Sequence, residues 1–309
     1  MYYFYISFQI IFPILFFMAL GVLIRQSGLI GEDAFAGING LVFRVFLPIK
    51  LFQEIYQSDF DDVFQPKILL YGVISVLIIY VLAWTVVSHF VRDRRDAPTL
   101  IQMVYRSNYV LFGLSVAENM YPDENLSLIS VMAAFVVPMF NILAVLLFEV
   151  FREREKLSVL HLLIGIAKNP LVLGSALALL VKGAGLEIPA LLQKTLIDLG
   201  AIATPLAIIC VGATLSFDAL KRYKNYLIWA TLGRLVIVPG VCLVLGLRGI
   251  ELAGLFLIYA TPVASSSYPM AREFDGNGEL AGLGVAASNV ACLFTLFLWI
   301  TLLKFFGLC

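Results

Sequence analysis

The chain has 309 residues and no formal net charge, and 61% of its residues are hydrophobic while only 14% are charged. Soluble domains carry about 25% charged residues, so this composition excludes a soluble globular domain and indicates a chain that lies largely in a lipid bilayer. No basic run suggests a nucleic-acid partner.

The apolar stretches predict an all-α membrane protein. A helix needs roughly 20 apolar residues to cross a bilayer. By this measure the sequence predicts ten spans, at residues 8–24, 35–56, 68–90, 100–120, 126–151, 161–181, 189–217, 226–247, 252–273 and 280–306. The first stretch lacks a basic leader and a small-residue cleavage site, so we interpret it as a retained span and not a signal peptide.

Basic residues between these spans are unevenly distributed. One side of the membrane receives eleven Lys and Arg residues and the other side receives five. Because basic connections stay in the cytoplasm, we expect the first side to be cytoplasmic. In the cell (inner) membrane, both termini would then be extracytoplasmic.

The two halves of the chain share a weak internal repeat. Pro13 and Pro48 align with Pro170 and Pro205 at an offset of 157 residues, and Asn108 aligns with Pro262 at an offset of 154. We therefore expect a first five-helix repeat at residues 1–151, a cytoplasmic linker at 152–158 and a second repeat at 159–309. Since five is an odd number of spans, the second repeat must be inverted, which is typical of secondary transporters.

The ninth predicted span contains a polar stretch, Tyr259–Met270, that an ordinary spanning helix would not contain. Pro262 has no amide N–H, so the carbonyl of Ile258 loses its helical partner, and Pro269 does the same to the carbonyl of Ser265. Unpaired carbonyls at membrane depth survive only where protein or a water-filled cavity meets them. The stretch therefore predicts a broken helix that lines a binding site.

The aligned stretch of span four supplies the other half of this predicted site. If the two broken helices cross, two helix starts, each with free N–H groups and about +0.5 of an elementary charge, would favour an anion. Side chains suited to capping these starts or to binding a carboxylate are Arg106, Ser107, Asn108, Thr261, Pro262, Ser265 and Ser266. For Arg106, a structural pair with Glu118 or a side chain that reaches toward the cytoplasm is the alternative.

Of the further charges inside predicted spans, four are candidate coupling or structural charges: Asp198, Glu54, Arg234 and Arg44. One interpretation is a structural ion pair among Arg44, Arg234 and Asp198. The other makes Asp198 or Glu54 a proton-coupling carboxylate, because burial can raise the pKa of an acid toward neutrality.

The order and spacing of motifs along nearly the whole chain resemble the auxin efflux carrier family, the bacterial relatives of plant PIN-type carriers. The matching pieces are Gly21-Val-Leu-Ile-Arg25, Gly28-Leu-Ile30, Asn39-Gly-Leu-Val-Phe43, Phe46-Leu-Pro48, Arg106-Ser-Asn108, Leu111-Phe-Gly113, Asn169-Pro170, Ile188-Pro189, Thr204-Pro-Leu-Ala207, Gly212-Ala213 and Thr261-Pro262. The resemblance implies a ten-span inverted-repeat fold similar to bile-acid transporters and sodium/proton antiporters, with crossing broken helices in a moving domain. It also implies transport of organic anions such as auxin, malonate or malate.

In this family an asparagine beside the crossing touches the substrate carboxylate, and both crossing helices carry a proline. Asn108 matches that asparagine and Pro262 the ninth-span proline, while Ser115 stands where the fourth-span proline would be. Because each broken helix falls in the same part of its half, we expect spans three to five and eight to ten to move against scaffold spans one, two, six and seven. In this arrangement the scaffold spans can form the interface of a homodimer.

The sequence thus predicts a secondary active transporter of a small carboxylate, with elevator-type alternating access. We expect no cofactor and no metal site, and H+ or Na+ are candidate coupling ions. A sodium/proton-coupled cation antiporter of the same fold is the alternative, although such an antiporter would require adjacent or facing carboxylates at the crossing to bind a cation. An enzyme is not expected, because His89 and His161 lie at span ends without metal-ligand spacing and the cysteines fall in apolar stretches.

Overall fold

The computed structural model describes residues 2–57, 66–121, 127–152, 164, 167–243 and 247–308. These residues form helices and no named strand; the helices labelled η are π-helical turns. The elements in chain order are α1 (Tyr2–Gln26), α2 (Glu32–Leu41), η1 (Val42–Phe46), α3 (Leu47–Gln57), α4 (Pro66–Phe90), α5 (Asp96–Tyr105), η2 (Tyr109–Leu114), α6 (Ser115–Met120), α7 (Ser127–Phe151), α9 (Pro170–Gly183), α10 (Ala190–Thr214), α11 (Phe217–Leu232), η3 (Gly233–Ile237), α12 (Val238–Cys242), α13 (Gly249–Ala260), α14 (Ser267–Glu273) and α15 (Gly278–Phe305).

Six helical segments of the described chain are long and apolar enough to cross a membrane. They are Asp33–Gln57, Pro66–Phe90, Val131–Phe151, Ala190–Thr214, Asp218–Cys242 and Gly278–Phe305. Shorter apolar helices cover Phe12–Gln26, Pro170–Gly183 and Gly249–Ala260. The prediction of an all-α, multi-pass membrane protein is therefore confirmed, whereas the count of ten spans stays a prediction. Part of the predicted sixth span lies outside the described residues.

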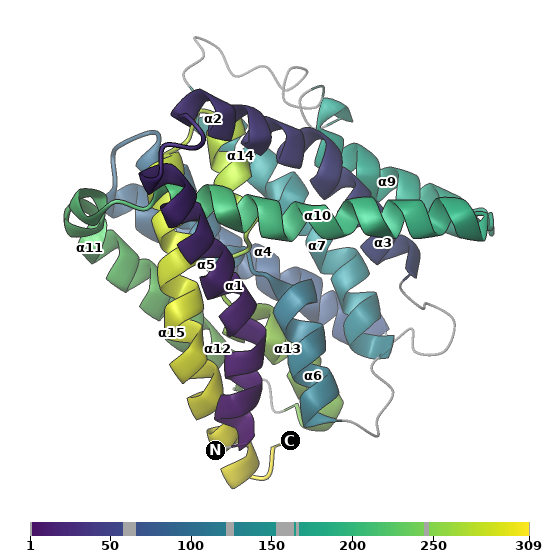
Figure 1. Cartoon of the computed structure of the whole chain (residues 1–309). Coiled ribbons are helices and arrows are strands. Elements are labelled where there is room, and N and C mark those ends of the chain that lie inside the picture. The colour runs from purple at the N-terminus through teal and green to yellow at the C-terminus, as the bar shows by residue number, and fades with distance from the viewer. Residues whose placement is uncertain are drawn as a thin grey trace.

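One group of helices packs through close backbone contacts. The helix α10 runs across the front of the molecule and contacts both α1 and α3 (Figure 1), and α3 also packs along α9. Glycines allow this approach, because a Cβ atom on Gly21 or Gly212 would collide with the carbonyl oxygen of Ile209 or Met18. In lipid, such van der Waals packing at small residues holds helices together in place of the hydrophobic effect.

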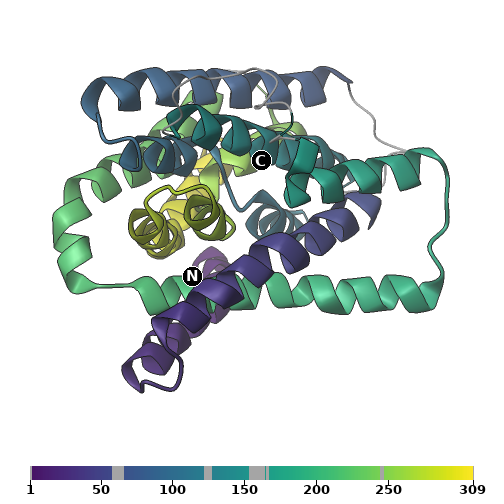
Figure 2. The same cartoon turned by 90° about the horizontal axis from the view of Figure 1, so that it is seen from above.

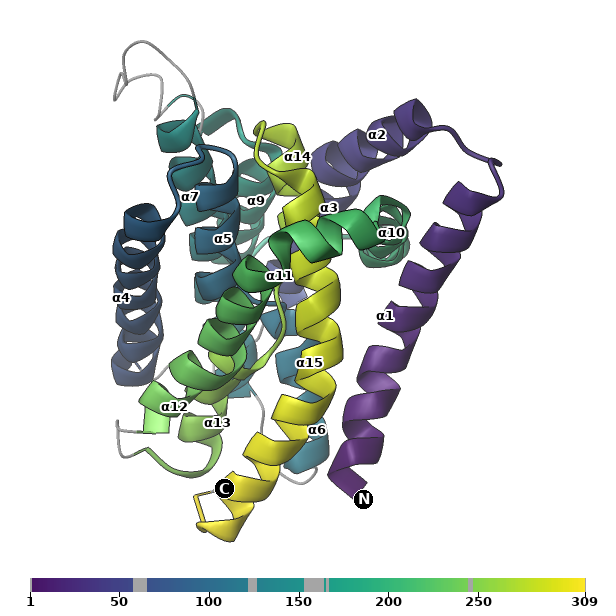
Figure 3. The same ribbon diagram turned by 90° about the vertical axis from the view of Figure 1, so that its left-hand side faces the viewer.

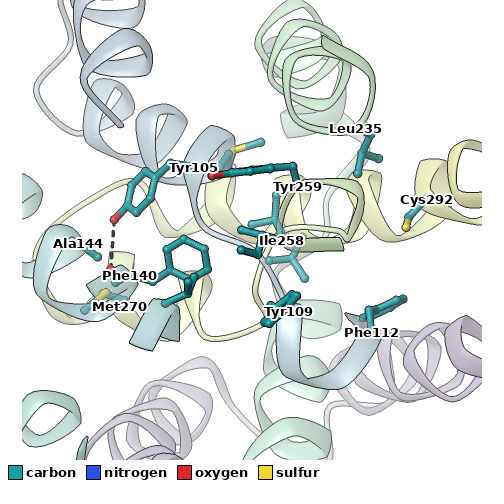
Figure 4. Packing of buried hydrophobic residues seen from close by; sticks show 14 of the residues in the cluster. Tyr105, Tyr109, Phe112, Phe140, Ala144, Leu235, Ile258, Tyr259, Met270 and Cys292 are labelled. Carbon is teal, nitrogen blue, oxygen red and sulfur yellow. Dashed lines mark hydrogen bonds between the residues drawn. The ribbon is translucent and has the colours of Figure 1, made fainter. Parts of the chain in front are cut away.

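The other helices gather around α15 and α7. Figure 2, seen from above, shows α15 in yellow along its axis, with the green α11 at the left and the blue α4 along the top. Contacts of α4 with α5 and α7, and of α15 with α11 and α14, hold this group together. Its core contains large aromatic side chains, and the Tyr105 hydroxyl donates to the carbonyl oxygen of Phe140 at 3.3 Å (Figure 4). The Tyr259 hydroxyl lies 2.6 Å from the Ser75 Oγ.

Two helices of this second group are interrupted near the middle of the molecule. The segment that begins as α5 loses helical structure after Tyr105 and continues as η2 and α6, and the segment that begins as α13 stops at Ala260 and continues as α14. In Figure 3, α5 and α14 lie in the upper half and α6 and α13 in the lower half, so the two segments run in opposite directions. The chain ends of α1 and α15 lie together at the lower end.

Candidate functional site

The two interrupted segments meet in a short antiparallel pairing. Ser107 and Val263 form an isolated β-bridge, in which the Asn108 amide N–H donates to the Pro262 carbonyl oxygen at 2.9 Å. The Val263 amide donates to the Ser288 Oγ on α15 at 3.1 Å. Both of these N–H groups therefore have acceptors within the protein. They precede η2 and α14, whose starts the sequence predicts to offer free amides.

The carbonyls released by the breaks are held by Arg234, which lies in the π-helical turn η3 and is 0% exposed. Its NH1 group donates to the carbonyl oxygens of Val104 and Tyr105 at 3.0 and 3.2 Å. Its Nε donates to the Thr261 carbonyl oxygen at 3.1 Å, and its NH2 group to that of Ile258. One guanidinium therefore caps the end of α5 and the end of α13 together.

The Ile258 carbonyl thus loses its helical partner, as Pro262 predicts, and gains Arg234 in exchange. The sequence predicts that Pro269, like Pro262, interrupts a helix. In the structure Pro269 lies in the first turn of α14, where no helical N–H is needed, so it does not interrupt a helix. A structural ion pair among Arg44, Arg234 and Asp198 is not formed. Arg44 pairs instead with Glu273 at 2.7 Å, and Asp198 is exposed on α10.

Arg106 is the residue that directly follows α5, and it is 3% exposed. Its NH2 group donates to the Asn141 Oδ1 at 2.5 Å and to the Ser266 Oγ at 2.9 Å. Its NH1 group donates to the Gln102 Oε1 at 3.3 Å. Arg106 is therefore fixed in the interior and does not extend toward the cytoplasm; the side chain of Glu118, the other partner that the sequence offered, lies outside the described part of the structure.

A cavity of about 50 Å³ opens between the crossing and the helices α3, α7, α9 and α10. This volume holds only a few water molecules. The polar and charged side chains that line the cavity are Lys50, Glu54, Arg106, Ser107, Asn108, Asn141, Thr204, Ser265 and Ser266. The lining thus combines residues from both groups of helices.

Three hydrogen-bond donors in this lining are buried and have no partner among the described residues. They are the Ser107 hydroxyl and the side-chain amides of Asn108 and Asn141. A buried donor without an acceptor costs about 1–3 kcal/mol, so unpartnered groups of this kind call for an explanation. Together with the adjacent Arg106 guanidinium, they form a wall that can donate to an oxygen-rich anion.

The structure distributes the predicted site residues unevenly. Ser107, Asn108, Ser265 and Ser266 line the cavity with Arg106. Ser266 stands at the N-cap position of α14, yet its side chain caps nothing and accepts from Arg106 instead. Thr261 and Pro262 lie at the crossing but are not among the residues that line the cavity; they contribute carbonyl oxygens to Arg234 and to the Asn108 amide.

Of the remaining predicted charges, Glu54 lies in the cavity wall, where Lys50 Nζ approaches its Oε1 at 3.0 Å. Sequence reasoning did not select Lys50 or Asn141 as site residues. Both are polar residues inside predominantly apolar spans, and that is the one signal by which they could have been found. Their direction toward the cavity depends on how α3 and α7 are rotated in the packed protein.

A helical membrane protein with two interrupted helices that cross beside a buried polar cavity has the architecture of a transporter. The chain belongs to the membrane transport protein family, whose model matches residues 6–300, and the resemblance to auxin efflux carriers is thereby confirmed. It is also 24% identical over 303 residues to the uncharacterized transporter YfdV of Escherichia coli K12, covering 93% of this chain and 95% of that protein. The YfdV proteins of Escherichia coli O157:H7 and Shigella flexneri match to the same extent. The chain is therefore a membrane transporter and not an enzyme.

Proposed function

We propose that this transporter carries a small organic anion, a mono- or dicarboxylate of malonate-like or auxin-like chemistry, by secondary active transport. The observation that carries the proposal is the set of unpartnered donors on Ser107, Asn108 and Asn141 beside Arg106. A carboxylate accepts several hydrogen bonds and carries the charge that a guanidinium matches. An anion in the cavity would therefore satisfy groups that the protein itself leaves without a partner.

The proposed fold is the ten-span, 5+5 inverted repeat, with α4–α7 and α11–α15 as the moving body and α1, α2, η1, α3, α9 and α10 as the scaffold. The opposite directions of the two interrupted segments support this division. The cavity is lined by the crossing and α7, from the proposed moving body, and by α3, α9 and α10, from the proposed scaffold. Sliding of the crossing along the scaffold would then move the substrate between the two sides, as an elevator mechanism requires.

The proposed location is the cell (inner) membrane, with both termini extracytoplasmic and a homodimer through the scaffold helices as the assembly. In the proposal, single cysteines at Glu187 and Lys224, both exposed, label from opposite sides of the membrane. Labelling of both positions by an impermeant reagent from one side would contradict the proposed topology. A variant in which Cys309 is replaced by Ser is the parent for this experiment, because the other cysteines are buried.

A sodium/proton-coupled cation antiporter is the alternative function, and Glu54 is the observation that favours it. Of the described residues that line the cavity, Glu54 alone carries a carboxylate, and Lys50 pairs with it. The crossing itself contributes a guanidinium and amide donors, which repel a cation. H+ or Na+ therefore enter the proposal as coupling ions, and no further cofactor is part of it.

Anion binding to the purified protein tests the proposed function. Asn108→Ala removes a hydrogen bond to a charged ligand, worth about 1.5–3 kcal/mol, so the affinity for a bound carboxylate falls roughly tenfold to more than a hundredfold. Asn225→Ala makes the same chemical change at an exposed position of α11 and leaves the affinity unaltered. If Asn108→Ala folds normally and binds every mono- and dicarboxylate as wild type does, the crossing is not the binding site.

A further inference from the structure

The charges around the cavity bear on which anions it accepts. Three charged side chains are among the described residues that line it: Arg106 and Lys50, which are positive, and Glu54, which is negative. Lys50 and Glu54 lie one helical turn apart on α3 and pair at 3.0 Å, with side chains that are 25% and 19% exposed. Arg106 lies across the cavity on the crossing and has neutral partners in Asn141, Ser266 and Gln102.

The formal charge of this lining is therefore +1 when Glu54 is ionised. Charge buried in a protein is costly unless it is compensated locally. A monovalent anion brings the cavity to neutrality, whereas a divalent anion leaves one negative charge uncompensated beside the Glu54 carboxylate. The unpartnered donors available to a ligand lie on the crossing, at Ser107 and Asn108, and on α7, at Asn141. A bound anion therefore sits beside Arg106 and faces the Lys50–Glu54 pair of α3.

We infer that Lys50 and Glu54 set the valence of the transported anion, with wild type selecting a monocarboxylate and Glu54 excluding dicarboxylates. This inference rests on the proposed function, because it concerns the same cavity. Glu54 acts here as a specificity-determining charge. Repulsion between Glu54 and the ligand scales with the ligand's own charge, so removal of the Glu54 charge relieves a dianion about twice as much as a monoanion.

Malonate and malonamate are a matched pair of probes, because replacement of one carboxylate by a carboxamide changes the charge and hardly changes the size. Dissociation constants are measured for both by calorimetry on the purified protein at pH 8, where malonate is a dianion. We expect wild type to prefer malonamate. Glu54→Gln raises the lining charge to +2 and shifts the malonate/malonamate affinity ratio toward malonate by roughly tenfold or more.

Two further variants separate charge from local packing. Lys50→Gln lowers the lining charge to zero and shifts the ratio further toward malonamate. The double variant with Lys50→Gln and Glu54→Gln returns the lining to +1, so its ratio returns to within about threefold of wild type if charge alone sets the preference. Size-exclusion profiles and melting temperatures identify variants that are folded and can be compared.

The outcomes distinguish failure of the valence inference from failure of the proposed anion site. A ratio that Glu54→Gln leaves unchanged, while Asn108→Ala still weakens both ligands, overturns the valence inference and leaves the anion site intact. The same holds for a double variant that keeps the shifted ratio of Glu54→Gln. If wild type binds neither malonate nor malonamate nor any other small carboxylate, the proposed function itself is wrong.

Discussion

Replacement of Arg234 is the sharpest test of how the crossing is held together. The Arg234 guanidinium makes four hydrogen bonds, to the carbonyl oxygens of Val104, Tyr105, Ile258 and Thr261. Methionine has a similar length but no donors, so Arg234→Met leaves carbonyls at the ends of α5 and α13 without partners. An unsatisfied buried group costs about 1–3 kcal/mol, and loss of a buried charged partner costs about 3–5 kcal/mol.

We expect Arg234→Met to lower the free energy of unfolding by about 3–5 kcal/mol, and not by the full sum over four bonds, because relaxation of the two helix ends and entry of water recover part of the loss. Arg234→Lys retains the charge and three donors but not the planar geometry that reaches both helix ends. Its loss should be smaller, about 1–2 kcal/mol.

Thermal and denaturant unfolding in detergent measure both changes. Arg222→Met is the matched control, because Arg222 lies on α11 in the same helical segment, Asp218–Cys242, and is exposed. Its pair with Glu279 spans 3.7 Å, and a surface pair of this kind is worth about 0–1 kcal/mol. Anion affinity should fall in the order wild type, Arg234→Lys, Arg234→Met, since the donors on the crossing lose their positions. If Arg234→Met has the same free energy of unfolding and the same anion affinity as the Arg222→Met control, the capping role assigned to Arg234 is refuted.

Two further predictions concern contacts between helices. Gly21→Leu places a side chain against the Ile209 carbonyl oxygen of α10 and should destabilise the protein by about 3 kcal/mol or more. Gly183→Leu is the control and should not destabilise it, because a Cβ atom at Gly183 meets nothing within 4 Å. Equal melting temperatures for the two variants would show that the α1–α10 contact is loose. Arg44→Glu breaks the pair with Glu273 between η1 and α14, and because Arg44 is 67% exposed the stability should change by at most about 1 kcal/mol. The rate of uptake into proteoliposomes should nevertheless change severalfold if α14 moves past η1, and exchange of the two charges should restore it; a rate insensitive to both changes would contradict that motion.

Local features of the sequence determined the class of this protein and the places where its helices break. Long apolar stretches with few charges predict membrane helices because the bilayer sets the length of an apolar helix. Pro262 removes an N–H wherever it occurs in a helix, so the break after Ala260 and the released Ile258 carbonyl were predictable without any neighbour. The family could likewise be predicted from the order of its motifs.

Only the tertiary structure decided which side chains meet at the crossing. Nothing near Arg234 in the sequence points to four carbonyls on two other segments, and nothing near Asn141 points to Arg106. Asp198 and Glu54 are both single acids in apolar spans, yet one is exposed on α10 and the other lines the cavity. Hydropathy and proline chemistry act within a few residues of the chain, whereas the direction of a side chain is set by the rotation and close packing of helices that are distant in sequence.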